Sequence, residues 1–244
     1  MRPLAHVPSG AAPRSANAIL AALPDAELRL LEPMDYLRLP ARHVLFEAGD
    51  AFRHLYFPVS GVVSFLHADQ KGLRPEIAQV GAEGMIGVSA LLGGDRMRHR
   101  VVMQIGGVVY RAPVSMARWA FAENGAFQTL ALGFAEVLMR QLSQNVICKL
   151  SHSIEQQFCQ RLLFYSDRAE DAMLEMTHEQ MAEALGTRRQ GITELARKLQ
   201  ALGVIAYSRG RVTVLDRVAL ERHSCECYWV LRDAYRLLTG QTHG

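Results

Sequence analysis

The chain has 244 residues, of which 50% are hydrophobic and 21% charged, and its formal net charge at pH 7 is +3. This composition suits a globular chain long enough for two domains, and the modest charge excludes a polybasic coat protein. No uncharged apolar run approaches the roughly 20 residues of a membrane span.

Residues 1–16 contain three prolines and two arginines without any periodicity, so we expect a flexible N-terminal tail. They lack the continuous apolar segment of a signal peptide, and we therefore expect a soluble, cytoplasmic protein. The cysteines at positions 148, 159, 225 and 227 are too few and too irregularly placed for a disulfide framework, so reduced thiols are expected.

Residues 17–126 are predicted to form a β-barrel sensor domain. Ten of the 19 glycines fall between Gly49 and Gly107, and they separate short strand-like runs. The expected strands are residues 43–47, 54–57, 62–67, 76–80 and 101–111. Short strands between glycine turns predict an antiparallel barrel or sandwich of jelly-roll type, which can enclose a small ligand.

A long helix is predicted over residues 127–167, where Gly133 is the single glycine and proline is absent. Apolar residues at spacings of three and four form one stripe, and they are Met139, Leu142, Val146, Leu150, Ile154 and Phe158. A helix of about 40 residues outreaches a barrel of this size. We therefore predict that residues 139–154 of the stripe pair with a second copy across a twofold axis, the alternative being that the stripe covers its own barrel.

Residues 177–199 have the spacing of a helix-turn-helix within a predicted C-terminal domain, residues 168–244. Thr177 and Gln180 form a capping-box start, and Met181 and Leu185 give the first helix an apolar face. Gly186 ends that helix. A second amphipathic helix follows, with a buried stripe of Ile192, Leu195 and Leu199.

The charge pattern supports a DNA-binding surface on the second helix. Residues 187–211 contain six Lys or Arg and one acid, whereas residues 169–183 contain five acids and no Lys or Arg. Residues 203–215 predict a hairpin wing around a Ser-Arg-Gly turn, followed by a C-terminal helical extension. An ordinary helical hairpin with a solvated basic face is the alternative. The candidate DNA contacts are Thr187, Arg188, Arg189, Gln190, Thr193, Glu194, Arg197, Lys198, Arg209 and Arg211.

The order of barrel, long helix and winged helix-turn-helix resembles the Crp/Fnr family of bacterial transcription regulators over about residues 20–220. Residues 81–94 look like the family's phosphate-binding cassette, and residues 177–199 look like its DNA-reading motif. The resemblance implies an α+β fold with a cyclic-nucleotide-binding-like barrel. It also implies a homodimer on a palindromic double-stranded operator, contact with RNA polymerase, and a possible small-molecule effector.

The predicted effector pocket departs from cyclic-nucleotide-binding members of that family. The glycine that matches Gly87 is followed there by a ribose-binding glutamate, and here by Val88. Arg98 and His99 are the nearest match to the family's phosphate-binding arginine and hydroxyl residue. We expect an effector other than cyclic AMP, or none. The pocket candidates are Gly84, Gly87, Val88, Ser89, Arg98 and His99.

Metal and cofactor sites are not expected. No cysteine precedes residue 148, which excludes the N-terminal iron-sulfur cluster of some family members. The run from His223 to Cys227 would need a non-helical turn to supply three ligands, so ordinary packed or surface thiols are expected.

The DNA-reading helix also departs from the family pattern, because Gln190 stands where Glu is usual and Glu194 where Arg is usual. We therefore expect an operator unlike the family's usual half-sites. Two other classes of function compete with a transcription regulator. A ligand-binding or protein-contacting regulatory module would not bind DNA, and an enzyme is disfavoured because no nucleophile-base spacing, P-loop or zinc-protease motif is found.

Overall fold

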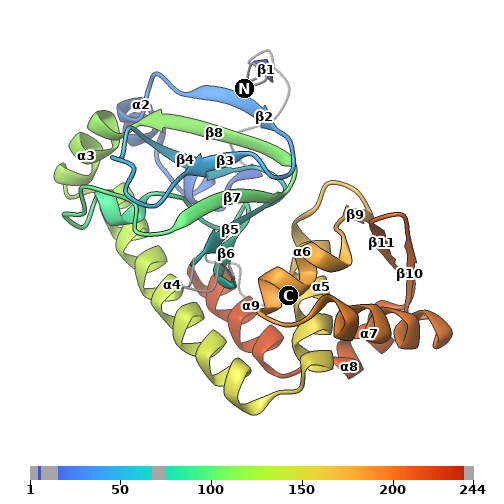
Figure 1. Ribbon diagram of the computed structural model, residues 1–244. Helices are drawn as coiled ribbons and strands as arrows, with labels where there is room; N and C mark the ends of the chain where they lie inside the picture. Colours follow the sequence, from blue (N-terminus) through green and yellow to red (C-terminus); the bar gives the residue numbers. More distant parts are fainter. Residues whose placement is uncertain (1–4, 7–15, 68–74, 239–244) are drawn as a thin grey trace.

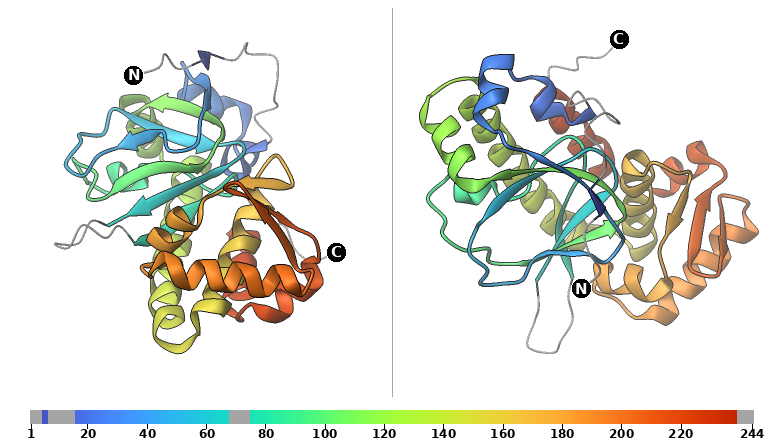
Figure 2. Two further views of the ribbon diagram at one scale, coloured as in Figure 1. Left: turned by 45° about the vertical axis from the view of Figure 1, so that its right-hand side comes forward. Right: turned by 90° about the horizontal axis from the view of Figure 1, so that it is seen from above.

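The computed structural model describes residues 5–6, 16–67 and 75–238. A β-barrel, a long helix α4 (Ala126–Ser151) and a C-terminal domain follow one another along the chain (Figure 1). Viewed from above, the barrel and the C-terminal domain lie side by side (Figure 2). Within the described ranges, no helix combines the length and apolarity that a membrane span requires.

The barrel consists of two four-stranded sheets whose paired strands are all antiparallel. One has the order β1-β2-β8-β4, and the other has the order β3-β7-β5-β6. Their bounds are β1 Ala5–His6, β2 Asp35–Leu39, β3 Val44–Phe46, β4 His54–Pro58, β5 Val62–Leu66, β6 Glu76–Val80, β7 Arg100–Ile105 and β8 Gly107–Pro113. The predicted α+β fold with an N-terminal jelly-roll barrel is confirmed.

The strands differ from the expected ones in three places. Strand β2 is not among the expected strands. The run predicted as one strand at residues 101–111 is divided into β7 and β8, which lie in different sheets. A Cβ on Gly107 would lie 2.3 Å from the carbonyl oxygen of Ser60, so the backbone crosses between sheets where a side chain cannot fit. In the predicted tail, Ala5–His6 pairs with β2, and the remainder up to residue 15 lies outside the described residues.

Three short helices close the barrel, namely α1 (Ala18–Ala21), α2 (Asp25–Leu30) and α3 (Val114–Ala122). Asn17 is fully buried and caps α1 by accepting hydrogen bonds from the amides of Ile19 and Leu20. Its Nδ2 donates to the carbonyl oxygens of Pro58 and Gly84. The cap therefore also ties the start of the chain to the barrel wall.

The predicted helix 127–167 is two helices, which corrects the expectation of one continuous helix. Helix α4 ends at Ser151, His152 is extended, and α5 runs from Ile154 to Arg168. Ser153 starts α5 with a capping box, in which its hydroxyl and the Gln156 side chain satisfy each other's backbone amides. The capping signal Ser-x-x-Gln overrides the continuous apolar pattern.

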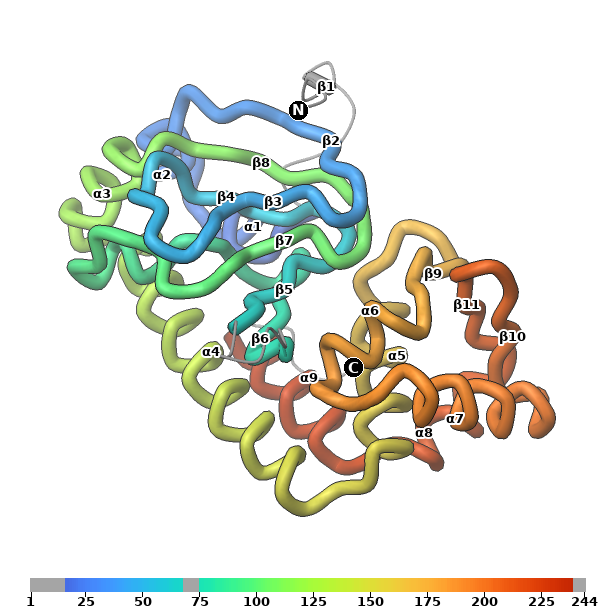
Figure 3. Tube along the Cα trace, in the orientation of Figure 1, coloured from blue at the N-terminus to red at the C-terminus, as the bar shows by residue number. Residues whose placement is uncertain are grey.

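The C-terminal domain has a second apolar core, which also includes Val62 of β5 and Ile105 of β7. It contains β9 (Met173–Glu175), α6 (His178–Leu185), α7 (Arg189–Ala201), β10 (Ile205–Ser208), β11 (Arg211–Val214), α8 (Arg217–His223) and α9 (Cys227–Leu238). Phe158, Leu162 and Tyr165 of α5 belong to this core. Helix α9 packs against both α4 and α5, and Figure 3 shows it between them.

Candidate DNA-binding interface

The helix-turn-helix has the local geometry that the sequence predicts. The Gln180 amide donates to Thr177 Oγ1 at 3.2 Å, and the Thr177 amide donates to Gln180 Oε1 at 2.8 Å. Gly186 ends α6 in the left-handed region at φ 60°, and the Thr187 amide donates back to the Ala182 carbonyl at 2.9 Å. This reversal leads directly into α7, whose helix begins at Arg189.

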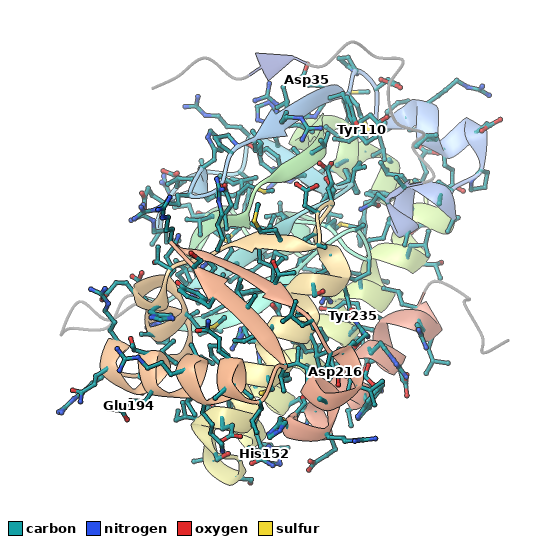
Figure 4. All side chains as sticks on the ribbon, turned by 90° about the vertical axis from the view of Figure 1, so that its right-hand side faces the viewer. Asp35, Tyr110, His152, Glu194, Asp216 and Tyr235 are labelled. Carbon is teal, nitrogen blue, oxygen red and sulfur yellow. The ribbon has the colours of Figure 1, made fainter. Side chains whose placement is uncertain are left out.

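Helix α7 has one buried side and one exposed side. Ile192, Ala196 and Leu199 are fully buried in the domain core. Arg189, Gln190 and Glu194 are exposed. In the view that faces the C-terminal domain, Glu194 projects outward from the middle of α7 (Figure 4). The exposed side therefore presents a guanidinium, an amide and a carboxylate, which are the groups that read base edges.

The exposed polar side chains of α7 already form contacts, one within the helix and one with α6. Gln190 Nε2 donates to Glu194 Oε1 at 3.2 Å, and Arg189 Nε lies 3.9 Å from Glu179 Oε2 of α6. Both contacts are solvent-exposed and therefore weak, so they can be exchanged for contacts to a ligand. Thr193 is partly buried, and its Oγ1 donates to the Arg189 carbonyl and lies 3.0 Å from His178 Nδ1.

Lys198 differs from the other candidates because its side chain is bonded to α5, outside the helix-turn-helix. Its Nζ donates to Glu155 Oε2 of α5 at 2.6 Å, and His223 Nδ1 lies 3.0 Å from the other oxygen of the same carboxylate. The hydrogen bond from Lys198, followed by the one from His223, lowers the pKa of Glu155. Lys198 thereby fastens the last turn of α7 to α5.

The predicted wing is the hairpin of β10 and β11. Ser208 pairs with Arg211, and the intervening Arg209 and Gly210 both have positive φ, at 49° and 77°. This is the two-residue turn that the twist of a hairpin favours, and it places Arg209 at the tip. Arg211 NH2 lies 3.3 Å from Glu175 Oε1 of β9, and both side chains are exposed.

Two aromatic rings that the sequence analysis did not single out lie behind this surface. The rings of His178 and Tyr207 stack at 4.0 Å, and Tyr207 Oη donates to the Met176 carbonyl at 2.9 Å. Burial, and then the charges of Arg189 and Arg197, lower the pKa of His178. The stack joins the start of α6 to the wing, and nothing in the sequence spacing indicates that these two residues meet.

The predicted effector residues do not share one buried surface. Val88 belongs to the barrel's apolar core, whereas Ser89 and Arg98 are exposed. Gly87 has a φ of 97°, and a Cβ on Gly84 would lie 2.2 Å from the Phe134 ring of α4. His99 is half-buried against His67, and burial, with a smaller contribution from His67, lowers its pKa.

The apolar stripe of α4 is exposed along its length. Met139, Leu142, Val146 and Leu150 have exposed fractions of 61%, 37%, 60% and 83%. The predicted continuation of the stripe is wrong, because Ile154 and Phe158 lie beyond the break and pack with the C-terminal core. A stripe this exposed in a 26-residue helix is an apolar surface that the described residues leave uncovered.

Two ion pairs join the barrel to α5. In the first, Arg161 pairs with Glu76 of β6, and both side chains are buried. The same carboxylate accepts hydrogen bonds from Tyr165 Oη at 2.7 Å and from the Ser64 hydroxyl. Burial lowers the pKa of Arg161 and raises that of Tyr165.

In the second, Arg168 NH2 lies 2.8 Å from Glu83 Oε1, and Nε of the same guanidinium contacts both oxygens. Glu83 belongs to the segment that resembles a phosphate-binding cassette, so α5 is linked to that segment directly. Neither Glu83 nor Arg168 was a sequence-predicted site residue. Their separation of 85 positions gives no local signal of the contact.

Comparison with sequence families matches two regions in the order of the fold. The cyclic nucleotide-binding domain matches residues 36–124, and the Crp-like helix-turn-helix domain matches residues 156–223. Similar proteins include the global nitrogen regulator of Synechococcus elongatus, which is 24% identical over 205 residues, 78% of this chain and 90% of that protein. The global nitrogen regulator of Nostoc sp. is 25% identical over 73% of this chain and 84% of its own length.

Solved structures of similar fold include a CRP-family transcriptional regulator from Thermus thermophilus. It has a TM-score of 0.62 and 23% identity, and the match covers 77% of this chain and 95% of that one. The c-di-GMP responsive global regulator CLP of Xanthomonas campestris has a TM-score of 0.63 and 16% identity, over 79% and 100% of the two chains. With a cyclic nucleotide-binding domain followed by a Crp-like helix-turn-helix domain, this chain belongs to the Crp/Fnr family of transcription regulators.

Proposed function

We propose that the chain is a homodimeric, sequence-specific regulator that inserts α7 into the major groove of a palindromic operator. The observation that carries this proposal is the exposed side of α7, where Arg189, Gln190 and Glu194 lie opposite the buried residues that fix the helix in its domain. Two such helices in a dimer must lie about 34–36 Å apart to fit successive major grooves.

The side chains of α7 and the wing take different parts in this proposal. Arg189 binds a guanine, Gln190 an adenine, and Glu194 accepts from a cytosine amino group. Arg209 and Arg211 of the wing contact phosphates, which sets register without reading sequence. Thr187, Arg188, Thr193 and Arg197 complete the surface. Lys198 acts by holding α7 against α5.

We further propose that α4 is the dimer helix, with Met139, Leu142, Val146 and Leu150 buried by the same residues of a second copy. Fully burying an apolar side chain of this size stabilises by about 1.5–3 kcal/mol, so burial of four on each chain favours a pair. These four side chains are exposed in the single chain, so they are available to a partner helix. RNA polymerase is the further partner proposed for the operator-bound dimer.

The barrel is proposed to sense a small molecule other than cyclic AMP. Val88 offers no hydrogen bond where a ribose-binding carboxylate would stand, a loss of about 1.5–3 kcal/mol. A conformational change in the cassette would be transmitted to the DNA-binding domain through the Glu83–Arg168 pair. A conformational change in β6 would be transmitted through the Glu76–Arg161 pair. Both contacts end on α5, so each can alter the orientation of α7 in the dimer.

The experiment is a binding titration on operator and scrambled duplexes at several salt concentrations. Arg189→Ala and Glu194→Ala should each cost roughly 1–3 kcal/mol on the operator and relax sequence preference there. Arg209→Ala and Arg211→Ala should weaken both duplexes alike and reduce the slope of log affinity against log salt by about 0.9 per contact.

The matched control is Arg96→Ala, which removes an exposed arginine from the barrel. It should change neither affinity nor the salt slope. If Arg189→Ala weakens the two duplexes equally, or changes neither, α7 does not read the major groove. Failure to bind any duplex at low salt would instead support a regulatory module that contacts protein.

A further inference from the structure

Four potential metal ligands converge where α4 ends and α9 begins. Cys148 lies in the last turn of α4, His152 caps that helix, Cys225 lies between α8 and α9, and Cys227 begins α9. Their Sγ and ring nitrogen atoms all lie within 4.8 Å of one another. Figure 4 shows His152 at the far end of the molecule from the barrel.

Three of the chain's four cysteines meet at this point although they come from regions 77 residues apart. All three are nearly or completely buried, and they form a group separate from the two apolar cores. Simple apolar packing does not account for an imidazole nitrogen within 4.8 Å of three thiols. The run from Ser224 to Glu226 is not helical, which is the condition for Cys225 and Cys227 to face the same point.

Two of the ligand separations match those around a single tetrahedral ion. With Zn–S bonds of about 2.3 Å and Zn–N bonds of about 2.0–2.1 Å, tetrahedral angles place two sulfurs about 3.8 Å apart and a sulfur and a nitrogen about 3.6 Å apart. Cys148 Sγ lies 3.7 Å from Cys225 Sγ, and Cys227 Sγ lies 3.5 Å from His152 Nδ1. A four-iron cluster places iron and sulfide atoms between its ligands and therefore needs them farther apart.

The polar groups next to these four side chains are of the kind that orients the ligands of a bound metal. His152 Nε2 lies 3.1 Å from Glu226 Oε1, so the carboxylate selects the tautomer that leaves Nδ1 free to coordinate. Gln144 Nε2 donates to Cys227 Sγ at 3.1 Å, a contact that favours a thiolate. Carboxylate-bound histidine and amide-bound thiolate are the outer contacts that orient the ligands of a zinc site.

We propose that Cys148, His152, Cys225 and Cys227 bind one zinc ion, which fastens the turn between α8 and α9 to the end of α4. The site has four protein ligands, so it is closed and structural. Binding displaces the thiol protons and leaves three thiolates and a neutral imidazole on the ion. This departs from the expectation of ordinary thiols, and His223, which pairs with Glu155, is not a ligand. The proposal does not rest on DNA binding.

The test begins with the unaltered full-length protein, purified under argon with a reductant. Mass-spectrometric metal analysis should find one zinc per chain, and modification of the thiols with a mercurial should release it in a single stoichiometric step. Replacement of zinc by cobalt should give the intense absorption of tetrahedral thiolate coordination. Metal-free protein that does not take up zinc or cobalt would overturn the proposal, as would labile sulfide or a disulfide between Cys148 and Cys225.

Variants then locate the site. Cys225→Ala and His152→Ala should lose the zinc, whereas Cys159→Ala and His223→Ala, which remove the remaining cysteine and the neighbouring histidine, should retain it. Glu226→Gln should weaken zinc affinity about 10–100-fold while leaving the stoichiometry at one. Circular dichroism confirms that each variant is folded. Zinc retained equally by Cys225→Ala and His152→Ala would place the metal elsewhere and refute the assignment.

Discussion

Breaking the buried ion pair between Glu76 and Arg161 should destabilise the protein far more than breaking a surface pair. The exposed fractions of the two side chains are 0% and 6%. Glu76→Gln keeps an oxygen that can accept from Tyr165 and Ser64, but it leaves the Arg161 guanidinium buried without a counter-charge. Loss of one partner of such a pair costs about 3–5 kcal/mol.

Further variants separate the contributions of the hydrogen bond and of the two charges to this free-energy cost. Tyr165→Phe removes one hydrogen bond to the carboxylate and should cost about 1.5–3 kcal/mol. The double variant Glu76→Gln with Arg161→Met removes both charges, so its cost should be lower than the sum of the single variants by about 0.5–3 kcal/mol. Glu136→Gln, which breaks the exposed pair with Arg140, is the control and should cost about 0.5 kcal/mol or less.

The assay is urea unfolding at pH 7, followed by tryptophan fluorescence. Trp119 of α3 reports on the barrel side and Trp229 of α9 on the C-terminal side, so separate transitions would show the two parts uncoupling. A Glu76→Gln cost below about 1 kcal/mol, or a double-variant cost equal to the sum of the singles, would refute the reasoning.

Three further predictions concern assembly, effector choice and pH. Val146→Glu with Leu150→Glu should give monomers with a folded barrel and weak operator binding, and a dimer in sedimentation would show that α4 is not the main interface. Cyclic AMP should neither raise the melting temperature nor tighten operator binding, and a saturable calorimetric signal at micromolar nucleotide would contradict this. Because the pKa of Glu155 is lowered in the folded state, its stabilising effect is present above the unfolded value of about 4.3 and is lost as pH falls through the folded value. Melting temperatures should therefore show Glu155→Gln less stable than the unaltered protein at pH 7, with a difference that shrinks as pH falls below the unfolded value, whereas a difference that does not change with pH would argue against the carboxylate's role.

Local sequence patterns predicted the helix-turn-helix well because its signals act over a few residues. The Thr177 capping box, the Gly186 turn and the Arg209-Gly210 hairpin are each found with the expected geometry. The same reasoning failed between α4 and α5, where an apolar pattern that ran through Ser153 concealed a second capping box. A helix that begins within an apolar stripe can be predicted only if the capping signal is given more weight than the apolar spacing.

Contacts between distant segments could not be predicted from one sequence. Glu83 and Arg168 meet because α5 packs against the barrel, and Cys148 and Cys225 meet because the start of α9 packs against the end of α4; no spacing encodes either contact. Nor could the sequence show that Lys198, one of six basic residues in its segment, is engaged with Glu155. Basic character predicts a surface, whereas the role of each residue on it depends on tertiary neighbours.

The break at His152 places a non-helical joint between α4 and α5. Helix α5 has 15 residues and is therefore about 22 Å long, so a rotation of about 10° at its start would move its far end by about 4 Å. The far end of α5 is Arg168, which pairs with Glu83 of the barrel, and Arg161 pairs with Glu76, so such a rotation would break both ion pairs. The break at His152 can therefore act as a hinge only when these two pairs are released, and while they are intact they hold α5 against the barrel.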